Sequence, residues 1–420
     1  MSNNNEKNHK DILSFIEKSC SAVQQQLIFR LIARAKELDY QLYLVGGAVR
    51  DALLNVTTND IDITVRGDAV SLAHIFAKEA TITSYHRFGT ATIAWRNNTI
   101  DLATIRQEAY PKPAALPVVQ RSEDIYEDLK RRDFTINAVA FDLTGDKGLI
   151  DPHNGRSDID KKLIRVLHDN SFVDDPTRIF RAARYATRLN FKIEEKTLAL
   201  LKKNIGTLKE LSADRIYHEL MVTLKEEKPE NTLRMWQQLG ALSYVFGEQE
   251  IRDYQASFAQ ARAEHNVSPN IYLALLLWPL NYTQMRFIIN KLNATRSTDR
   301  FLDQCLKLKQ LLPSIAQKET NYAIYQALED FNDDVLNIAL TETSVSAQAK
   351  TNIRHFKNKL KRIDLELNGH MLIDMGIDSG KEIADVLQKT LAQKLNFGLA
   401  SVEDELAFAK NYAQKKNYIS

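Results

Sequence analysis

The chain has few of the features that mark secreted, membrane or zinc-binding proteins. Its 420 residues include only two cysteines, Cys20 and Cys305, which lie far apart and without the spacing of a metal site. Such sparse cysteine predicts a reducing, cytoplasmic setting without disulfides or structural zinc. The longest apolar run, IYLALLLWP at residues 271–279, is too short to span a bilayer and predicts a buried helix. We therefore expect no membrane partner.

A strong net charge is missing as well. The 56 basic and 54 acidic side chains nearly cancel, so the overall charge does not indicate a nucleic-acid-binding protein. Any such surface has to come from local clusters of charge. The length predicts about two to four domains with ample hydrophobic core.

The most informative stretch is LYLVGGAVRDALLNVTTNDIDITV, residues 42–65. Its pattern predicts a buried strand, a turn at Gly46 and Gly47, a short helix, and a second strand carrying Asp60 and Asp62. Side chains alternate along a strand, so both carboxylates point to one side, where oxygen ligands suit Mg²⁺. The free N–H groups of a helix start favour an anion such as phosphate. A Gly-Gly pair by itself is usually only a tight turn, and two acids by themselves are usually only part of a solvated strand edge. Found together, the two features favour a metal and phosphate site.

The residues GGAVRDALL followed by DIDI resemble the nucleotidyltransferase superfamily with a polymerase-beta-like palm. More narrowly, they resemble the bacterial-type (class II) tRNA nucleotidyltransferase and poly(A) polymerase family. The resemblance implies two Mg²⁺ ions, a cradled triphosphate and a third metal-binding acid on a neighbouring strand. The implied residues are Asp60, Asp62 and Asp101 for the metals, and Gly46, Gly47 and Arg50 for the triphosphate. Asp101 by itself is equally compatible with an exposed strand carboxylate.

An uninterrupted match to the same family is RRDFTINA, residues 131–138. The resemblance implies that Arg132, Asp133 and Asn137 contact the sugar and phosphates of a nucleotide. From the residues alone, Asp133 is equally explained as the N-cap of a helix. The preceding residues, 110–127, contain three prolines and no sustained period, which predicts a long loop; in the family such a loop helps to reorganise the nucleotide pocket.

Residues 174–189, DDPTRIFRAARYATRL, predict a helix. Asp175 and Arg178 share a face of it and are ordinarily a cap and a surface ion pair. The resemblance implies that this pair reads the base, because an acidic-Asp-x-x-Arg motif does so in the family. In such a pair the carboxylate accepts a hydrogen bond from the amino group of the base, and the guanidinium donates one to a ring nitrogen. This pattern admits C and A and rejects U and G. Arg181, Arg184 and Arg188 extend a basic stripe, interpreted either as a solvated face or as phosphate contacts.

Beyond about residue 225 the pattern is almost entirely helical and poor in glycine. Basic side chains cluster at residues 286–300 and more densely at 350–362. A basic helix is usually a solvated face, but with an RNA substrate phosphate binding becomes the better interpretation. The predicted RNA-binding residues are Arg354, Lys357, Lys359, Lys361 and Arg362.

Together the patterns and the resemblance predict an α+β fold. A polymerase-beta-like nucleotidyltransferase palm of mixed sheet and helices would come first, followed by an all-α neck, body and tail. The predicted divisions are a disordered or helical extension (1–21), the palm (22–150), the neck with its base-reading helices (151–225), the body (226–345) and the tRNA-binding tail (346–420).

The resemblance implies an enzyme that adds CCA to tRNA 3′ ends without a template. It would use CTP and ATP, transfer the nucleotide by a two-metal mechanism with Mg²⁺, and release pyrophosphate. The expected partners are tRNA lacking a complete 3′ end and the two nucleotides, but neither DNA nor a membrane. A CC-adding or A-adding specialist and a poly(A) polymerase remain alternatives because they share the palm. A non-catalytic RNA-binding protein is an alternative of another class.

Overall fold

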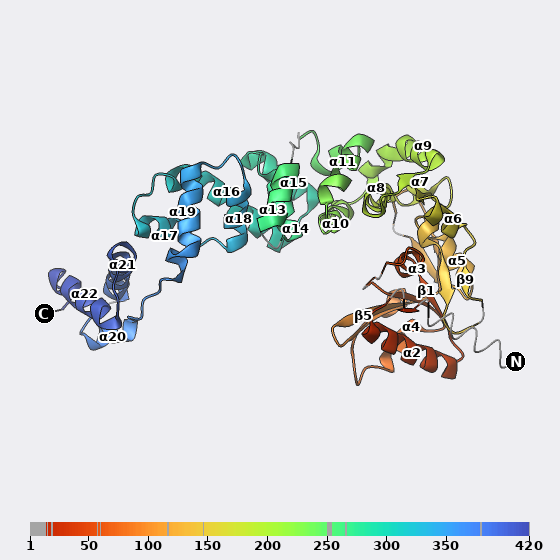
Figure 1. The fold of residues 1–420 in the computed structure, drawn as a ribbon, viewed down its shortest axis with the longest axis horizontal. Coiled ribbons are helices and arrows are strands. Elements are labelled where there is room, and N and C mark those ends of the chain that lie inside the picture. The colour runs from red at the N-terminus through yellow and green to blue at the C-terminus, as the bar shows by residue number, and fades with distance from the viewer. Residues whose placement is uncertain are drawn as a thin grey trace. The chain divides into compact units, whose positions relative to one another are not determined.

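The computed structural model divides the chain into two compact units, Met1–Gly247 and Glu248–Ser420. Strands occur in the first unit, and the described part of the second is helical (Figure 1). The structure describes residues 14, 16–17, 20–56, 58, 60–115, 117–145, 147–249, 254–264, 267–378 and 380–419.

The first unit is built on a seven-stranded mixed sheet with the order β3-β4-β5-β2-β1-β8-β9. Strand β2 pairs antiparallel with β1 and parallel with β5, so segments far apart in the sequence lie side by side at the centre of the sheet. This sheet confirms the predicted palm of mixed strands. The strands are β1 (Gln41–Val45), β2 (Asp62–Arg66), β3 (Thr81–Tyr85), β4 (Thr90–Trp95), β5 (Asn98–Thr104), β8 (Ala140–Asp142) and β9 (Leu149–Ile150).

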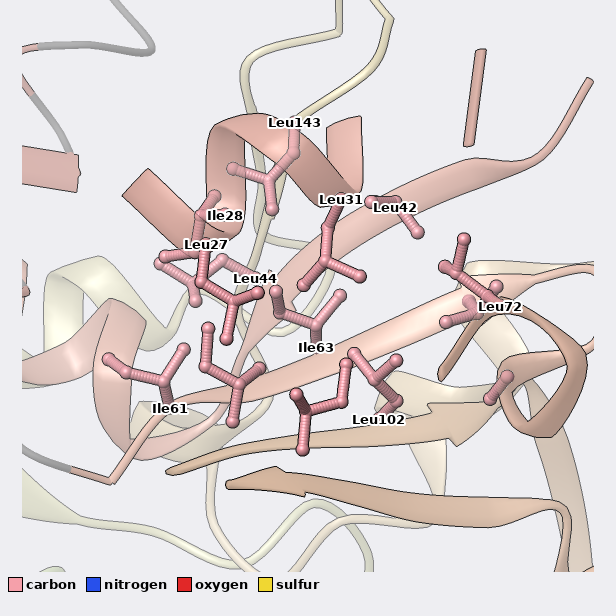
Figure 2. Packing of buried hydrophobic residues seen from close by; sticks show 14 of the residues in the cluster. Leu27, Ile28, Leu31, Leu42, Leu44, Ile61, Ile63, Leu72, Leu102 and Leu143 are labelled. Carbon is pink, nitrogen blue, oxygen red and sulfur yellow. The ribbon is translucent and has the colours of Figure 1, made fainter. Parts of the chain in front are cut away.

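Two helices, α2 (Ala22–Glu37) and α4 (Ala69–His74), cover one face of this sheet. Helix α2 begins at a capping box formed by Ser21 and Gln24, which satisfies free N–H groups of its first turn. Figure 2 shows apolar side chains of α2 packed against those of the central strands; Leu27, Leu31, Leu44 and Ile63 are among them. Because side chains alternate along β2, burying Ile63 directs Asp62 to the opposite face.

The opposite face of the sheet is covered only in part. Helix α5 (Ile125–Lys130) packs over β1 and β8, where Tyr43 and Leu129 share a small apolar cluster. Strands β6 (Arg106–Ala109) and β7 (Val118–Arg121) form a separate hairpin. The long loop predicted at residues 110–127 is therefore shorter, because β7 and the start of α5 lie inside that range.

Helices form the rest of the first unit, around α8 at its centre. Helix α11 packs on α8, where the rings of Trp236 and Phe180 lie 4.6 Å apart. Helices α11 and α12, which follow the predicted end of the neck at residue 225, belong to the same compact unit as α8. The helices are α6 (Gly155–Asp160), α7 (Ser171–Asp174), α8 (Thr177–Leu189), α9 (Glu195–Asn204), α10 (Ala213–Thr223), α11 (Pro229–Leu239) and α12 (Leu242–Phe246), beside a short β10–β11 pair (Leu163–Ile164, Lys192–Ile193).

The second unit contains the apolar run as helix α14, whose residues 271–277 are all buried. In the described residues no helix combines the length and apolar character needed to cross a bilayer. Cys20 and Cys305 are both free and buried. The helices are α13 (Gln255–Glu264), α14 (Pro269–Leu277), α15 (Tyr282–Leu292), α16 (Arg296–Ile315), α17 (Asn321–Leu328), α18 (Asp333–Thr341), α19 (Ala347–Asn358), α20 (Gly369–Asp374), α21 (Gly380–Phe397) and α22 (Val402–Lys415).

Candidate active site

Three carboxylates meet where β2 and β5 run side by side. Asp62 is the first residue of β2 and is the register partner of Asp101 on β5. Each of these acids and Asp60 offers an oxygen, and these oxygens lie within 4.8 Å of one another. The sequence predicts Asp60 and Asp62 within one strand; in the structure β2 begins at Asp62 and Asp60 precedes it. The convergence of the three acids is therefore a property of two neighbouring strands and a loop.

Burial and the two neighbouring acids disfavour the ionised form of Asp62. Burial is the largest cause that raises the pKa of Asp62, to about 6, and the charge of Asp60 adds to it, whereas Arg132 acts in the opposite direction. A hard divalent cation would neutralise such a cluster, and carboxylate oxygens are the ligands it prefers. The donor set therefore fits the predicted Mg²⁺.

A pocket of about 370 Å³ opens beside the carboxylates. Arginine side chains face the acids across it, and buried Asp128 holds two of them, accepting from Arg131 Nη2 at 2.8 Å and from Arg132 Nη2 at 2.9 Å. The sequence reasoning missed Arg106, although its position just after the strand of Asp101 was visible. An anion such as a triphosphate fits this pocket by charge. Its charged lining residues are Asp62, Asp101, Arg106, Arg131 and Arg132.

A buried chain of hydrogen bonds joins the Gly-Gly helix α3 (Gly47–Leu53), the RRDFTINA motif and helix α8. Arg50 Nη1 donates to Asn137 Oδ1 at 2.7 Å, and Asn137 Nδ2 donates to Asp133 Oδ1 at 3.0 Å. Arg181 Nε then donates to Asp133 Oδ2 at 2.8 Å. Burial opposes the ionisation of Asp133, but the charge of Arg181 and the bond from Asn137 outweigh it and lower the pKa of Asp133 to about 2. Four predicted nucleotide-binding residues are thus brought together.

The structure shows the local surroundings of Asp133 and of the α8 arginines. Only a short 3-10 turn, Thr135–Asn137, follows Asp133, so Asp133 caps no α-helix. Arg181 and Arg184 do not form a solvated face: Arg181 pairs with Asp133, and buried Arg184 donates to Glu219 at 2.5 Å. These two arginines therefore join α8 to neighbouring elements.

Arg178 lines a second pocket, of about 430 Å³, together with Asp174 and His168. The Arg178 guanidinium is buried; it donates to Ser171 Oγ at 2.6 Å and to the Arg131 carbonyl oxygen at 2.9 Å. Its donors are therefore held in one orientation at the wall of a cavity large enough for a nucleotide base.

Asp175 is not among the residues that line this second pocket. Its Oδ1 accepts from the Thr177 N–H at 3.0 Å and from Arg215 Nη2 at 2.5 Å. Arg215 also donates to the carbonyl oxygen of Ala114 at 2.9 Å. Arg215 therefore links the segment between β6 and β7 to the start of α8.

Comparison with known proteins identifies the family. A model described as the Poly A polymerase head domain matches residues 42–165, and one described as a probable RNA and SrmB-binding site of polymerase A matches residues 190–252. The A-adding tRNA nucleotidyltransferase of Halalkalibacterium halodurans is 29% identical over 93% of both chains. The chain belongs to the bacterial-type tRNA nucleotidyltransferase and poly(A) polymerase family.

Other relatives of this nucleotidyltransferase carry two different names. The A-adding tRNA nucleotidyltransferase of Aquifex aeolicus is 32% identical over 84% of this chain, which spans only 45% of the length of that relative. The CCA-adding enzyme of Lactobacillus gasseri is 27% identical over 86% of this chain and 90% of its own.

Solved structures of CCA-adding enzymes share the fold of this nucleotidyltransferase. An apo form superposes with a TM-score of 0.71 at 28% identity and covers 94% of this chain and 97% of its own. The Thermotoga maritima enzyme complexed with tRNA gives a TM-score of 0.66 at 27% identity, covering 95% and 97%. Complexes with ATP and with CTP give 0.68 and 0.66 at 28% identity, each covering 96% of this chain, with 96% and 97% of their own chains covered.

The predicted RNA-binding residues of this nucleotidyltransferase lie on α19 and the turn that follows it. Lys357 and Lys361 have partners within their unit, because Lys357 donates to Asn337 and Lys361 pairs with Asp333 at 2.8 Å. The exposed members are Arg354, Lys359, Lys361 and Arg362.

Gly46 of this nucleotidyltransferase adopts a backbone conformation with φ +68°, and an added Cβ would lie 2.9 Å from Arg132 Nη1. We expect Gly46→Ala to lower the free energy of unfolding by about 1–3 kcal/mol and to reduce nucleotide incorporation, because Arg132 has to move. Calorimetry and a primer-extension assay check this. Gly206→Ala is the matched control, since nothing lies within 4 Å of its added Cβ. Equal effects of the two variants would contradict the explanation.

Proposed function

We propose that this nucleotidyltransferase adds CCA to the 3′ end of tRNA from CTP and ATP without a template. The observation that carries the proposal is that the three acids lie at an arginine-lined pocket next to a second pocket lined by Arg178. Arg131 lines both pockets. The names of the relatives and of the tRNA, ATP and CTP complexes support the same substrates. We place the reaction in the cytoplasm, where both free thiols stay reduced.

In the proposed reaction the RNA 3′-oxygen attacks the α-phosphorus, a P–O bond forms, and the bond to pyrophosphate breaks. Asp60, Asp62 and Asp101 would hold the metal. Two bound Mg²⁺ ions would lower the pKa of the 3′-hydroxyl and offset the charge of the leaving pyrophosphate. Arg106 and Arg132 would bind the triphosphate, and the buried Asp128 keeps Arg132 oriented for this.

Sugar and base recognition are assigned to the elements beside these acids. Arg50, Asn137 and Asp133 shape the sugar site through their buried bonds, and Arg181 holds it against α8. Arg178 would donate to the ring nitrogen of C or A. Every hydrogen bond that the described residues donate to Asp175 ends on its Oδ1, so Oδ2 can accept from the base amino group.

Base reading by Arg178 predicts a change in selectivity. We expect Arg178→Lys to lower the preference for CTP over UTP by about 10- to 100-fold, because one charged hydrogen bond contributes about 1.5–3 kcal/mol and an ammonium cannot replace the planar fork. Competition assays with both nucleotides measure this ratio. Arg188→Lys, on the exposed side of the same helix, should leave the ratio unchanged. An unaltered ratio in Arg178→Lys would remove the assignment.

The function itself is tested with tRNA transcripts that end before CCA, after C and after CC. Each is incubated with Mg²⁺ and CTP, ATP or both, and product lengths are read on a sequencing gel. We expect completion of all three substrates to CCA, followed by arrest. Long A-tails would identify a poly(A) polymerase, and no pyrophosphate release at all would identify a non-catalytic RNA-binding protein.

A second candidate, addition of the terminal A alone, is favoured by the names of the Aquifex and Halalkalibacterium relatives. The same palm and the same base pocket serve it. Extension of only the CC-ending transcript, and only with ATP, would identify this specialist. Arrest after CC would identify the CC-adding alternative.

A further inference from the structure

One face of β3, β4 and β5 stays open beside the metal-binding acids. Thr83 of β3 pairs with Thr92 of β4, which pairs with Asp101 of β5, and Tyr85 pairs with Thr90 two residues further along. Residues at paired positions point to the same face of a sheet. Tyr85 and the three threonines therefore share the face of the acids, while the alternate residues of β4 and β5 enter the core.

Aromatic side chains stand exposed at the end of this face. Tyr85 is 58% exposed and Phe88 is 50% exposed. Tyr85 also lines the 370 Å³ pocket that contains the acids and the arginines. The short turn between β3 and β4 is closely held, because Gly89 has φ +59° and its carbonyl oxygen accepts from the Thr104 N–H at 2.8 Å. At the end of β3, Tyr85 thus presents an exposed ring to a ligand in the pocket.

We propose that this face binds the 3′-terminal nucleotide of the RNA and that its base stacks on Tyr85. The inference rests on the proposed function. Strands in a sheet are about 4.8 Å apart, so β3 lies about 10 Å from β5. A base stacked at Tyr85 thus leaves its own ribose between the ring and Asp101, where the 3′-hydroxyl has to react. Thr90 and Thr92 line the intervening surface. The Thr92 hydroxyl donates to Asp101 Oδ1 at 2.5 Å, so Thr90 is the threonine that offers its hydroxyl to the ribose and phosphate.

Stacking suits a primer whose last base changes during the reaction. Every base has a π-face, so an aromatic platform binds the end of the RNA whichever nucleotide was added last. Hydrogen-bond recognition of that base would instead favour one step of the addition over the others. The structure thus separates two tasks: Arg178 selects the incoming base, and Tyr85 accepts any terminal base.

The test uses tRNA that carries 2-aminopurine as its 3′-terminal base, without added nucleotide. Binding to the wild-type protein should quench the fluorescence, and Tyr85→Ala should lose the quenching. In extension assays Tyr85→Ala should raise the KM for tRNA by about 5- to 100-fold, with a smaller change in kcat. Tyr85→Phe keeps the ring and should behave as the wild type. Tyr126→Ala removes another exposed ring, 47% exposed on α5, and should change neither readout.

Outcomes separate this inference from the proposed function. If the wild type extends tRNA while Tyr85→Ala shows unchanged quenching and KM, the stacking platform is wrong and the proposed function stands. If the wild type extends no tRNA, the proposed function fails. Loss of a concentration-dependent dimer in Tyr85→Ala, with unchanged kinetics, would identify the face as a contact between two copies and overturn the inference.

Discussion

Asp62→Asn is expected to abolish nucleotide incorporation, lowering kcat about 10³-fold or more, because metal-assisted charge stabilisation supplies several kcal/mol of the barrier reduction. The substitution removes one of the three clustered carboxylates while keeping nearly the same shape. Affinity for tRNA should stay close to that of the wild type. Single-turnover extension and a filter-binding assay measure the two quantities.

The same variant is expected to be more stable than the wild type in metal-free buffer at pH 8. A carboxyl whose folded-state pKa is raised above its unfolded value destabilises the fold at any pH where it is ionised. With the pKa of Asp62 raised to about 6 and the side chain partly exposed, Asp62→Asn should gain about 1–2 kcal/mol in the free energy of unfolding. Urea unfolding in EDTA checks this.

The control for both readouts is Asp160→Asn, an exposed acid at the end of α6. Its kcat should be unchanged and its free energy of unfolding should shift by about 0.5 kcal/mol or less. An Asp62→Asn variant that kept a tenth of kcat would remove the metal assignment. A variant that lost stability would instead show that the carboxylate supports the fold.

Arg181→Met is expected to lower the free energy of unfolding of the first unit by about 3–5 kcal/mol, because it leaves the buried carboxylate of Asp133 without its opposite charge. Among the described residues, Asp133 then keeps the bonds from Asn137 and from the Phe134 N–H. Methionine retains the apolar stem, so the loss reports the charge pair rather than the packing. Urea unfolding followed by tryptophan fluorescence measures the change.

Arg188→Met, on the exposed side of the same helix, is the matched control and should cost about 0.5 kcal/mol or less. The double variant Asp133→Leu/Arg181→Met should recover part of the loss, because it removes the orphaned charge as well. If the single variant at Arg181 unfolds like the Arg188 control, the buried pair contributes nothing to stability.

The stability difference between the wild type and Arg181→Met should also depend on pH. The pKa of Asp133 is lowered to about 2 in the folded state, below its ordinary value of about 3.9. A carboxyl group whose pKa is lowered by folding stabilises the fold at any pH above its pKa in the unfolded chain. This stabilisation is lost as the pH falls through its pKa in the folded protein. The difference should therefore be full at pH 7 and shrink below about pH 4. Melting temperatures at pH 7, 5, 4 and 3 test this, and a constant difference would contradict it.

Local sequence patterns predicted much of this site. The strand alternation around Asp62 follows from side-chain periodicity, and the Gly-Gly turn before α3 from backbone sterics. The RRDFTINA motif is one unbroken string, and two of its residues, Asn137 and Asp133, meet Arg50 and Arg181 in the structure. Such features depend on residues that are close neighbours in the chain, so the sequence alone is enough to predict them.

Other features depended on partners far away in the chain. The role of Arg181 as the partner of Asp133 spans 48 positions, and nothing in the α8 stripe distinguishes this pairing from a solvated face. Arg106 was missed because its neighbours in the pocket, Arg131 and Asp62, belong to other strands and helices. The start of β7 was missed because its hydrogen bonds come from β6 rather than from an apolar period of its own.

By itself the sequence determined the fold class, the family and the proximity of Asp60 to Asp62, since turn chemistry, side-chain alternation and short motifs are local properties. Only the tertiary structure decided which charges are paired inside the protein and which are left to face a ligand. Hydrogen bonds and ion pairs form between whatever groups the packing of the sheet and helices brings within about 3 Å. The open face that carries Tyr85 was decided in the same way, by which strands pair and which face the helices cover.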